Sequence, residues 1–343
     1  MVRPRHVSIK DIARRAGVSH STVSRALADS PLIADDTKER IRRLAREMEY
    51  SPSAIARGLV TQRTSTVGMV VTTIADPFIA EVVRGVEETA LDHGYSVILC
   101  DCNAEPEREL NCVQALREKR VDSIIVTSSR VGNLYVPLLE ELAVPIVLIN
   151  NQHDGHYVHS IRIDDVTGGY IAGSYLASLG HRDIAYIAGP AGTQSSRDRL
   201  EGLKRAMQEC GREVSPAWIV PGDGRPEGGE RSADQILRAD TRPTAILCYN
   251  DMTAIGALRT LRSAGVRIPQ DISVMGYDDI RFAAYVEPPL TTISQPKYTL
   301  GQRAFLLALN LVDHQDELAD SILIPELVVR DSCGYCTEAS EAS

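Results

Sequence analysis

The chain has 343 residues, of which 43% are hydrophobic and 24% charged, with seven cysteines and a formal net charge of −9. This length predicts two or three domains with a large core. Because no stretch approaches about eighteen uninterrupted apolar residues and the N-terminus is a polar arm, we expect neither a membrane span nor a signal peptide. An odd number of cysteines, scattered along the chain, is typical of reduced thiols, which indicates a cytoplasmic protein.

The charge is divided unevenly along the chain. Residues 1–63 hold 13 basic and 7 acidic side chains, a net of +6, whereas the remaining 280 residues hold 24 and 39, a net of −15. A basic head on an acidic body predicts that nucleic acid is contacted at one end of the molecule only.

The segment 8–27 predicts two short helices that meet at Gly17, a left-handed stop. Ser8 and Asp11 are spaced for a near capping box, and Ser19 with Thr22 begins the second helix. That helix turns its apolar residues inward and leaves a polar face: His20, Ser21, Ser24 and Arg25. Such a face, supported by the preceding helix, suits the major groove of DNA. The alternative at this point is an ordinary helical hairpin on a protein surface.

A third helix begins at Asp35 and has an apolar stripe, which completes an all-α head over residues 1–50. Residues 51–65 are expected to form a hinge and linker. Ser51-Pro52 is a typical helix start, but the following stretch, 53–60, is too short to be stable alone in water. We therefore expect this hinge helix to fold on DNA, with the apolar edge at Leu59 wedged into the minor groove.

The run Ile12-Ala13, Ala16-Gly17-Val18-Ser19 and Thr22-Val23-Ser24-Arg25, followed by Tyr50-Ser-Pro and Leu59, resembles the lac repressor family of transcription regulators. The resemblance implies a homodimer on a pseudo-palindromic operator, with bases read by His20, Ser21 and Arg25. The full set of implied DNA-binding residues is Ser8, Ser19, His20, Ser21, Thr22, Ser24, Arg25, Ser53, Ala56 and Leu59.

Residues 66–343 alternate between apolar runs and amphipathic helical stretches. The runs are continuous rather than alternating, which predicts strands covered on both faces and hence parallel, doubly wound α/β sheets. They lie at 67–71, 97–99, 124–126, 146–149, 184–187, 218–220, 245–247 and 272–275. The resemblance implies the two-lobed fold of periplasmic binding proteins, with lobe 1 at 66–162 plus 292–324 and lobe 2 at 163–291 plus 325–335.

Polar residues follow several of these strands, where a cleft between the lobes would bind a ligand. The alternative for each is a helix cap or a turn, and Asp251 is the clearest candidate for a cap. The resemblance implies effector contacts at Asp76, Phe78, Asn150, Ser195, Arg197, Asn250 and Asp278. Arg197 and Asp278 are expected to pair in the empty cleft and then to share the hydroxyls of a sugar. Gly224 departs from the family pattern, because several members have a stacking aromatic there, which argues against a purine.

The sequence contains no phosphate loop, nucleophile elbow or HExxH motif, so we expect no enzyme, no cofactor and no metal site. The expected function is that of a sequence-specific regulator, a repressor, whose operator affinity responds to a carbohydrate-like effector. Two alternatives remain: a regulator with a non-sugar co-repressor such as a nucleobase, and a sugar-binding protein without a regulatory role. The expected location is the cytoplasm, at the nucleoid.

Overall fold

The computed structural model describes residues 7–50, 63–129, 131, 144–150, 159–314 and 321–336. The chain divides into two compact units, Met1–Ser65 and Thr66–Ser343. The predicted hinge and its candidate residues Ser53, Ala56 and Leu59 lie outside the described residues. Among the helices that are described, none is long and apolar enough to cross a membrane.

The first unit contains three helices, α1 (Ile9–Ala16), α2 (His20–Leu27) and α3 (Asp35–Glu47). The Asp11 carboxylate accepts hydrogen bonds from the Ser8 backbone N–H and hydroxyl at 3.0 and 2.6 Å, which fixes the start of α1. Gly17 ends α1 with a φ of +67°, which confirms the left-handed stop that the sequence predicts. Ser19 Oγ accepts from the Thr22 N–H at 3.1 Å and so caps α2.

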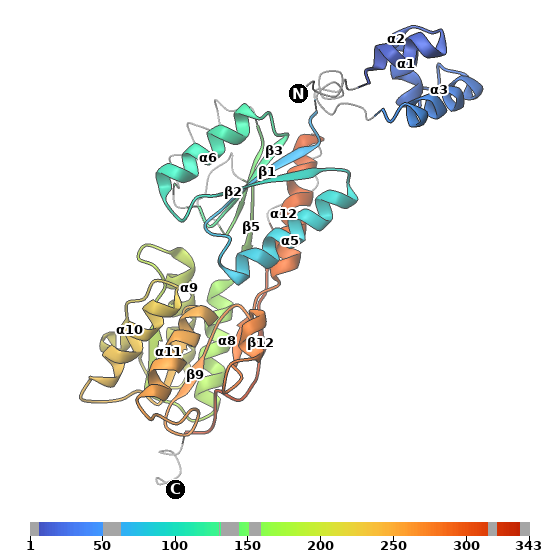
Figure 1. Ribbon diagram of the computed structural model, residues 1–343. Coiled ribbons are helices and arrows are strands. Elements are labelled where there is room, and N and C mark those ends of the chain that lie inside the picture. Colours follow the sequence, from blue (N-terminus) through green and yellow to red (C-terminus); the bar gives the residue numbers. More distant parts are fainter. Residues whose placement is uncertain are drawn as a thin grey trace, which may run out of the picture. The chain divides into compact units, whose positions relative to one another are not determined.

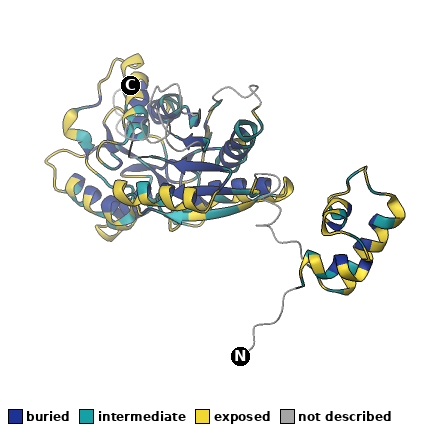
Figure 2. Cartoon of the chain, turned by 90° about the horizontal axis from the view of Figure 1, so that it is seen from above, coloured by how far each residue is buried: buried dark blue, intermediate teal, exposed yellow. Residues whose placement is uncertain are grey.

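A small apolar core holds these helices together, and their outer surfaces are exposed (Figure 2). Its fully buried members are Ile12, Val23, Ala26 and Ile41. The outward face of α2 is exposed along its length, as the sequence predicts, at His20, Ser21, Ser24 and Arg25.

Lobe 1 is built on a six-stranded parallel sheet in the order β11-β5-β4-β3-β1-β2. Helices α5 and α12 cover one face, where Val67 and Met69 join their core, and α6 covers the other, where Val70 is buried (Figure 1). Both faces are therefore apolar, which explains the continuous runs. The elements are β1 (Thr66–Val71), α5 (Pro77–Asp92), β2 (Ser96–Asp101), α6 (Pro106–Glu118), β3 (Ser123–Thr127), β4 (Ile146–Ile149), β5 (His159–Ile163), α12 (Lys297–Val312) and β11 (Ser321–Leu323).

Lobe 2 repeats this plan with a four-stranded parallel sheet in the order β7-β6-β8-β9. Ile184 and Tyr186 of β6 pack with α8 and α9, whereas Ala185 and Ile187 point to the opposite face, which α10 and α11 cover. The elements are α8 (Asp165–Ser178), β6 (Ile184–Ile187), α9 (Gln194–Glu209), the 3-10 helix η2 (Pro216–Trp218), β7 (Ile219–Val220), α10 (Pro226–Leu237), β8 (Ala245–Cys248), α11 (Asp251–Ser263), β9 (Ser273–Met275) and the 3-10 helix η3 (Arg281–Ala284).

One strand and one helical turn differ from the expected arrangement. β10 (Thr292–Ser294), expected in lobe 1, pairs antiparallel with β12 (Glu326–Val328) in a separate two-stranded sheet. Trp218, expected in a strand, ends η2 instead, because Pro216 after Ser215 starts a helical turn there. The chain thus passes between the lobes after β5, after β10 and after β11.

Candidate functional site

A cavity of about 660 Å³ lies at the carboxyl ends of strands from both lobes. In each sheet the strand order reverses there, between β1 and β3 and between β6 and β8, and such switch points are where α/β sheets bind ligands. The lining combines residues after β1, β3 and β4 with residues after β6, β8 and β9. It includes Thr72, Thr73, Asp76, Phe78, Ser128, Asn150, Thr193, Ser195, Arg197, Arg199, Gly224, Tyr249, Asn250, Asp278 and Gln295.

The lobe 1 side of the cavity carries three of the predicted contacts. Asp76 caps α5, since its Oδ1 accepts from the Phe78 N–H at 2.9 Å, and burial raises the pKa of its carboxyl group. The cap places the Phe78 ring at the cavity. Asn150 ends β4 with a φ of +55°, and its Oδ1 accepts from the Ile163 N–H at 3.1 Å. Each polar group here has a structural partner as well as a place in the lining.

On the lobe 2 side, Asn250 rather than Asp251 caps α11. Asn250 Oδ1 accepts from the Thr253 N–H at 2.9 Å, and its Nδ2 donates to the Gly224 carbonyl at 3.0 Å. Asp251 is fully buried and accepts hydrogen bonds from Thr292 Oγ1 at 2.6 Å and from the Ile280 N–H at 2.8 Å. The alternative that Asp251 caps α11 is therefore wrong: Asn250 is the cap, and Asp251 joins the start of α11 to Thr292 of β10 and to the backbone at Ile280.

The expected ion pair between Arg197 and Asp278 does not form. Arg197 is exposed at the edge of the cavity, where its guanidinium donates to Gln194 Oε1 and, at 3.0 Å, to the Gly192 carbonyl. The guanidinium that faces Asp278 belongs to Arg199, whose Nη1 lies 4.0 Å from Asp278 Oδ1. The physical reason is helical spacing: Arg199 lies one turn after Ser195 on the same face of α9, whereas Arg197 lies about 200° around the helix.

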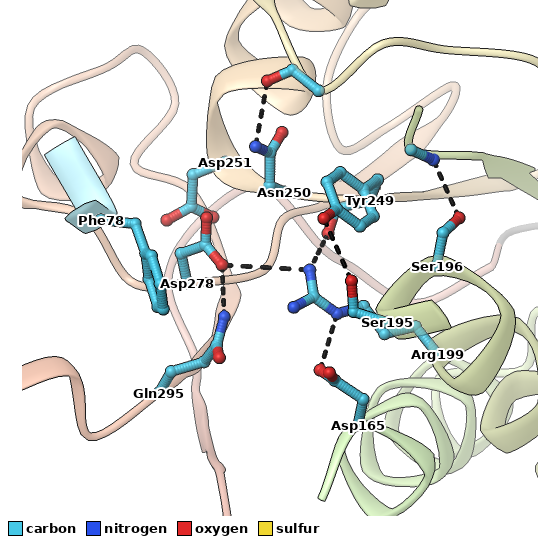
Figure 3. A network of polar contacts seen from close by, with 12 residues as sticks. Phe78, Asp165, Ser195, Ser196, Arg199, Tyr249, Asn250, Asp251, Asp278 and Gln295 are labelled. Carbon is cyan, nitrogen blue, oxygen red and sulfur yellow. Dashed lines mark hydrogen bonds and ion pairs between the residues drawn. The ribbon is translucent and has the colours of Figure 1, made fainter. Parts of the chain in front are cut away.

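Arg199 is held from several sides (Figure 3). Its Nε donates to Asp165 Oδ1 at 2.8 Å, and its Nη1 donates to the Tyr249 carbonyl at 2.6 Å. The guanidinium also lies over the rings of Tyr277 and Tyr249, at 3.7 and 4.7 Å from their centroids. Only 4% of the residue is exposed, so this charge has a fixed position in the floor of the cavity.

Asp278 lies beside Arg199 and is 4% exposed. Burial raises the pKa of its carboxyl group well above the ordinary range, while Arg199 opposes that shift. Its Oδ1 accepts from Gln295 Nε2 at 2.5 Å. The other end of that amide, Gln295 Oε1, is buried and has no hydrogen-bond partner among the described residues. A buried acceptor without a donor is costly, and a bound molecule that donates to it would remove the cost.

Sequence reasoning missed Arg199, Gln295 and Tyr249. Arg199 had a signal in its spacing from Ser195, but Gln295 follows a three-residue strand and meets Asp278 only through the tertiary fold. Tyr249 lies beside Gly224, where a Cβ would be 3.4 Å from the tyrosine ring. An aromatic ring thus lines the cavity at the place where the sequence predicted that stacking was lost.

The first unit offers a second candidate site, the exposed outer face of α2. Ser19 Oγ lies 2.7 Å from Ser21 Oγ and 2.9 Å from Thr22 Oγ1, so the hydroxyl groups at the start of α2 form one connected group. Arg25 is exposed one turn further on. Short polar side chains and an arginine on the outer face of a second helix have the form of a recognition helix. A three-helix unit of this kind followed by a two-lobed binding body defines a ligand-controlled DNA-binding protein.

Comparisons with known proteins agree with this class. Residues 8–53 match the family model of bacterial regulatory proteins of the lacI family, and residues 64–337 match that of periplasmic binding proteins and the sugar-binding domain of the LacI family. The chain is 37% identical over 332 residues to an HTH-type transcriptional repressor PurR of Haemophilus influenzae (strain PittEE), covering 95% of this chain and 98% of the relative.

Two solved structures are similar over most of the chain. The lac repressor dimer bound to operator and the anti-inducer ONPF has a TM-score of 0.85 and 28% identity, and covers 96% of this chain and 99% of its own. The complex of the transcriptional regulator CelR with cellobiose has a TM-score of 0.73 and 29% identity, and covers 95% and 100%. The chain belongs to the LacI family, and it is a DNA-binding transcriptional repressor of that family rather than an enzyme.

Proposed function

We propose that a carbohydrate-like effector in the cavity between the lobes controls the operator affinity of this repressor. The observation that carries the proposal is the group of Arg199, Asp278 and Gln295 in the cavity floor. It presents a fixed guanidinium, a buried carboxyl group and a carbonyl oxygen that lacks a donor. Neighbouring hydroxyls both donate and accept hydrogen bonds, so a sugar diol satisfies all three groups together.

The second candidate effector is a nucleobase that acts as a co-repressor. The sequence relatives named PurR favour it, and the rings of Phe78 and Tyr249 in the cavity lining supply aromatic surface. Gly224 itself contributes no side chain, and the ring of Tyr249 lies beside it. A sugar uses the hydrogen-bonding groups of the cavity floor, whereas a nucleobase uses the aromatic rings of the lining. A screen of both classes of compound separates the two candidates.

For DNA, we propose that two copies bind a pseudo-palindromic operator in the cytoplasm, each with α2 in the major groove. His20, Ser21 and Arg25 then face bases, with Ser8, Ser19, Thr22 and Ser24 at their side. The hinge contacts at Ser53, Ala56 and Leu59 stay predictions from the sequence. The effector contacts proposed at Asp76, Phe78, Asn150, Ser195 and Asn250 complete the cavity around the three floor residues.

The test is a thermal-denaturation screen of the full-length protein with pentoses, hexoses, cellobiose, sugar phosphates, hypoxanthine, guanine and adenine. A compound present at about 100 times its Kd stabilises the body by about 2.7 kcal/mol. We expect a carbohydrate to raise the melting temperature and to change affinity for DNA fragments that the protein itself selects from a random pool.

Asp278→Asn is expected to abolish the response, because the amide replaces an acceptor with a donor. Arg238→Ala serves as the control and is expected to respond like the natural protein, since Arg238 is an exposed arginine at the end of α10 and is not part of the cavity lining. Stabilisation by a nucleobase alone would establish the second candidate. If no compound of either class changes melting or DNA affinity, the proposal of an effector in this cavity is wrong.

A further inference from the structure

The first residue of α12, Lys297, holds an unusual place between the lobes. Its ammonium group donates to the backbone carbonyls of Asp278 at 2.5 Å, Asp279 at 2.9 Å and Gln295 at 3.3 Å. A positive charge at the start of a helix is opposed by the helix dipole. The favourable interactions of this ammonium group are thus with the three carbonyls, two of which belong to the turn that carries Asp278.

That turn has a backbone conformation that L-residues rarely adopt. Asp278 and Asp279 have φ values of +118° and +55°, so each is in a region that favours glycine. Such a conformation persists only where surrounding contacts hold it. Lys297 supplies two of these contacts from lobe 1, and the amide of Gln295 supplies another to the Asp278 side chain.

On the other side of Lys297, α12 is joined closely to α5. A Cβ on Gly85 would lie 2.2 Å from the Tyr298 carbonyl oxygen, and one on Gly301 would lie 2.1 Å from the Val82 carbonyl oxygen. Only glycine allows this approach, so the two helix backbones touch and move as one body. The start of α5 carries Phe78 to the opposite wall of the cavity.

We propose that Lys297 is a positioning residue that ties the Asp278 turn of lobe 2 to the α5–α12 helix pair of lobe 1. A molecule that binds Asp278 is then coupled to α5 and α12 through the Lys297 ammonium group and the three carbonyls that it binds. Helix α5 carries Phe78 on the opposite wall of the cavity. This proposal deepens the proposed function. It rests on the proposed function only in so far as the molecule that binds Asp278 is taken to be an effector. The mechanical link is a property of the unliganded chain.

Arg330 provides a matched control, because it binds the same turn from within lobe 2. Its Nη2 donates to Asp279 Oδ1 at 2.6 Å and its Nη1 to the Leu290 carbonyl at 2.8 Å. Loss of Arg330 therefore removes a cation from the turn but no bond to lobe 1. Both Lys297→Met and Arg330→Met remove a cation that binds the turn, but only Lys297→Met breaks a bond between the turn and α12.

The experiment is amide hydrogen exchange on full-length protein without ligand, for the natural chain, Lys297→Met, Lys297→Arg and Arg330→Met. In Lys297→Met we expect exchange about tenfold faster both at the Asp278–Asp279 turn and in the first turn of α12. Lys297→Arg keeps a charged donor and is expected to restore protection to within about threefold of the natural chain. Arg330→Met is expected to loosen the Asp278–Asp279 turn while leaving α12 unchanged.

Unchanged exchange at α12 in Lys297→Met would overturn the proposal, and so would equal loosening of α12 in Arg330→Met, which marks a general loss of stability. If Lys297→Met does not fold, Lys297→Gln, which retains a donor without charge, replaces it with the same expected pattern. Since no ligand is added, failure of every compound in the effector screen leaves this result standing, and the reverse also holds.

Discussion

At the scale of single residues, the buried guanidinium of Arg199 dominates the cavity floor. Its removal leaves the side chain of Asp165, 2% exposed, and that of Asp278, 6% exposed, without their cation. Breaking a buried ion pair by removing one partner is strongly destabilising. We expect Arg199→Met to lower the free energy of unfolding in urea by about 3–5 kcal/mol. Arg197→Ala is the matched control, with an expected loss within about 0.5 kcal/mol, and equal losses would contradict the assignment.

His181 is expected to make the stability of the folded protein depend on pH. The residue is 2% exposed, with Nδ1 3.0 Å from Thr244 Oγ1 and Nε2 3.0 Å from the Gly334 carbonyl. Burial lowers the pKa of the imidazole in the folded state. The unfolded chain therefore takes up a proton first, and the stability contributed by neutral His181 is lost as pH falls below about 6.5.

The measurement is the urea midpoint of the natural protein and of His181→Gln between pH 8 and pH 5. The natural protein is expected to lose more stability over this range than the variant, whose side chain keeps polar atoms but does not titrate. A difference between the two proteins that is independent of pH would show that His181 acts by packing alone.

The contrast between Arg197 and Arg199 also shows how far residues can be predicted from a sequence. Ser195 lies on the face of α9 that lines the cavity. The resemblance to the family, however, leads us to expect the cavity cation at Arg197, which lies on another face of the helix. Helical geometry, which is local, identifies Arg199 once Ser195 is placed. Gln295 has no such local signal, because it reaches Asp278 from 17 residues away along the chain.

At the scale of elements, the exposed face of α2 is where sequence recognition is expected. Arg25→Ala is expected to weaken binding to selected DNA by about 1–3 kcal/mol and to relax selectivity at one base position in each half-site. The measurement is a titration against selected and random duplexes at one salt concentration. Arg14→Ala is the control, since Arg14 is an exposed arginine of α1 whose Nη1 lies 3.5 Å from Asp11 Oδ1. An equal loss on random DNA would mean that Arg25 contacts only phosphates.

The predictable elements are those with a strong local pattern. The long apolar runs became β1, β3, β4, β6 and β8, because strands covered on both faces leave no polar position. β5 contains His159 and Arg162 and so breaks the apolar pattern. β10, β11 and β12 have three residues each, and their pairing is decided by partners elsewhere in the chain. Short strands of this kind have too little local signal to be found from sequence alone.

At the scale of the whole molecule, the three-helix head and the two-lobed body have separate cores. We therefore expect scanning calorimetry of the full chain to resolve two unfolding transitions. A compound that binds the cavity is expected to raise the temperature of the body transition only, and selected DNA that of the head transition. A single transition, shifted equally by both, would show that head and body unfold as one unit.

The chain crosses between the lobes three times, and these crossings also determine the order in which the two lobes are completed during synthesis. Lobe 1 starts at Thr66, yet its helix α12 and its edge strand β11 come from residues 297–323, after the whole sheet of lobe 2. While the chain is still growing, the face of lobe 1 that Leu300, Ala304 and Phe305 cover in the finished protein is covered by α5 alone and lacks α12. The lobe that is begun first is therefore finished last, and a ribosome that stops before residue 297 releases a chain in which the part of this apolar face that α12 would cover is exposed.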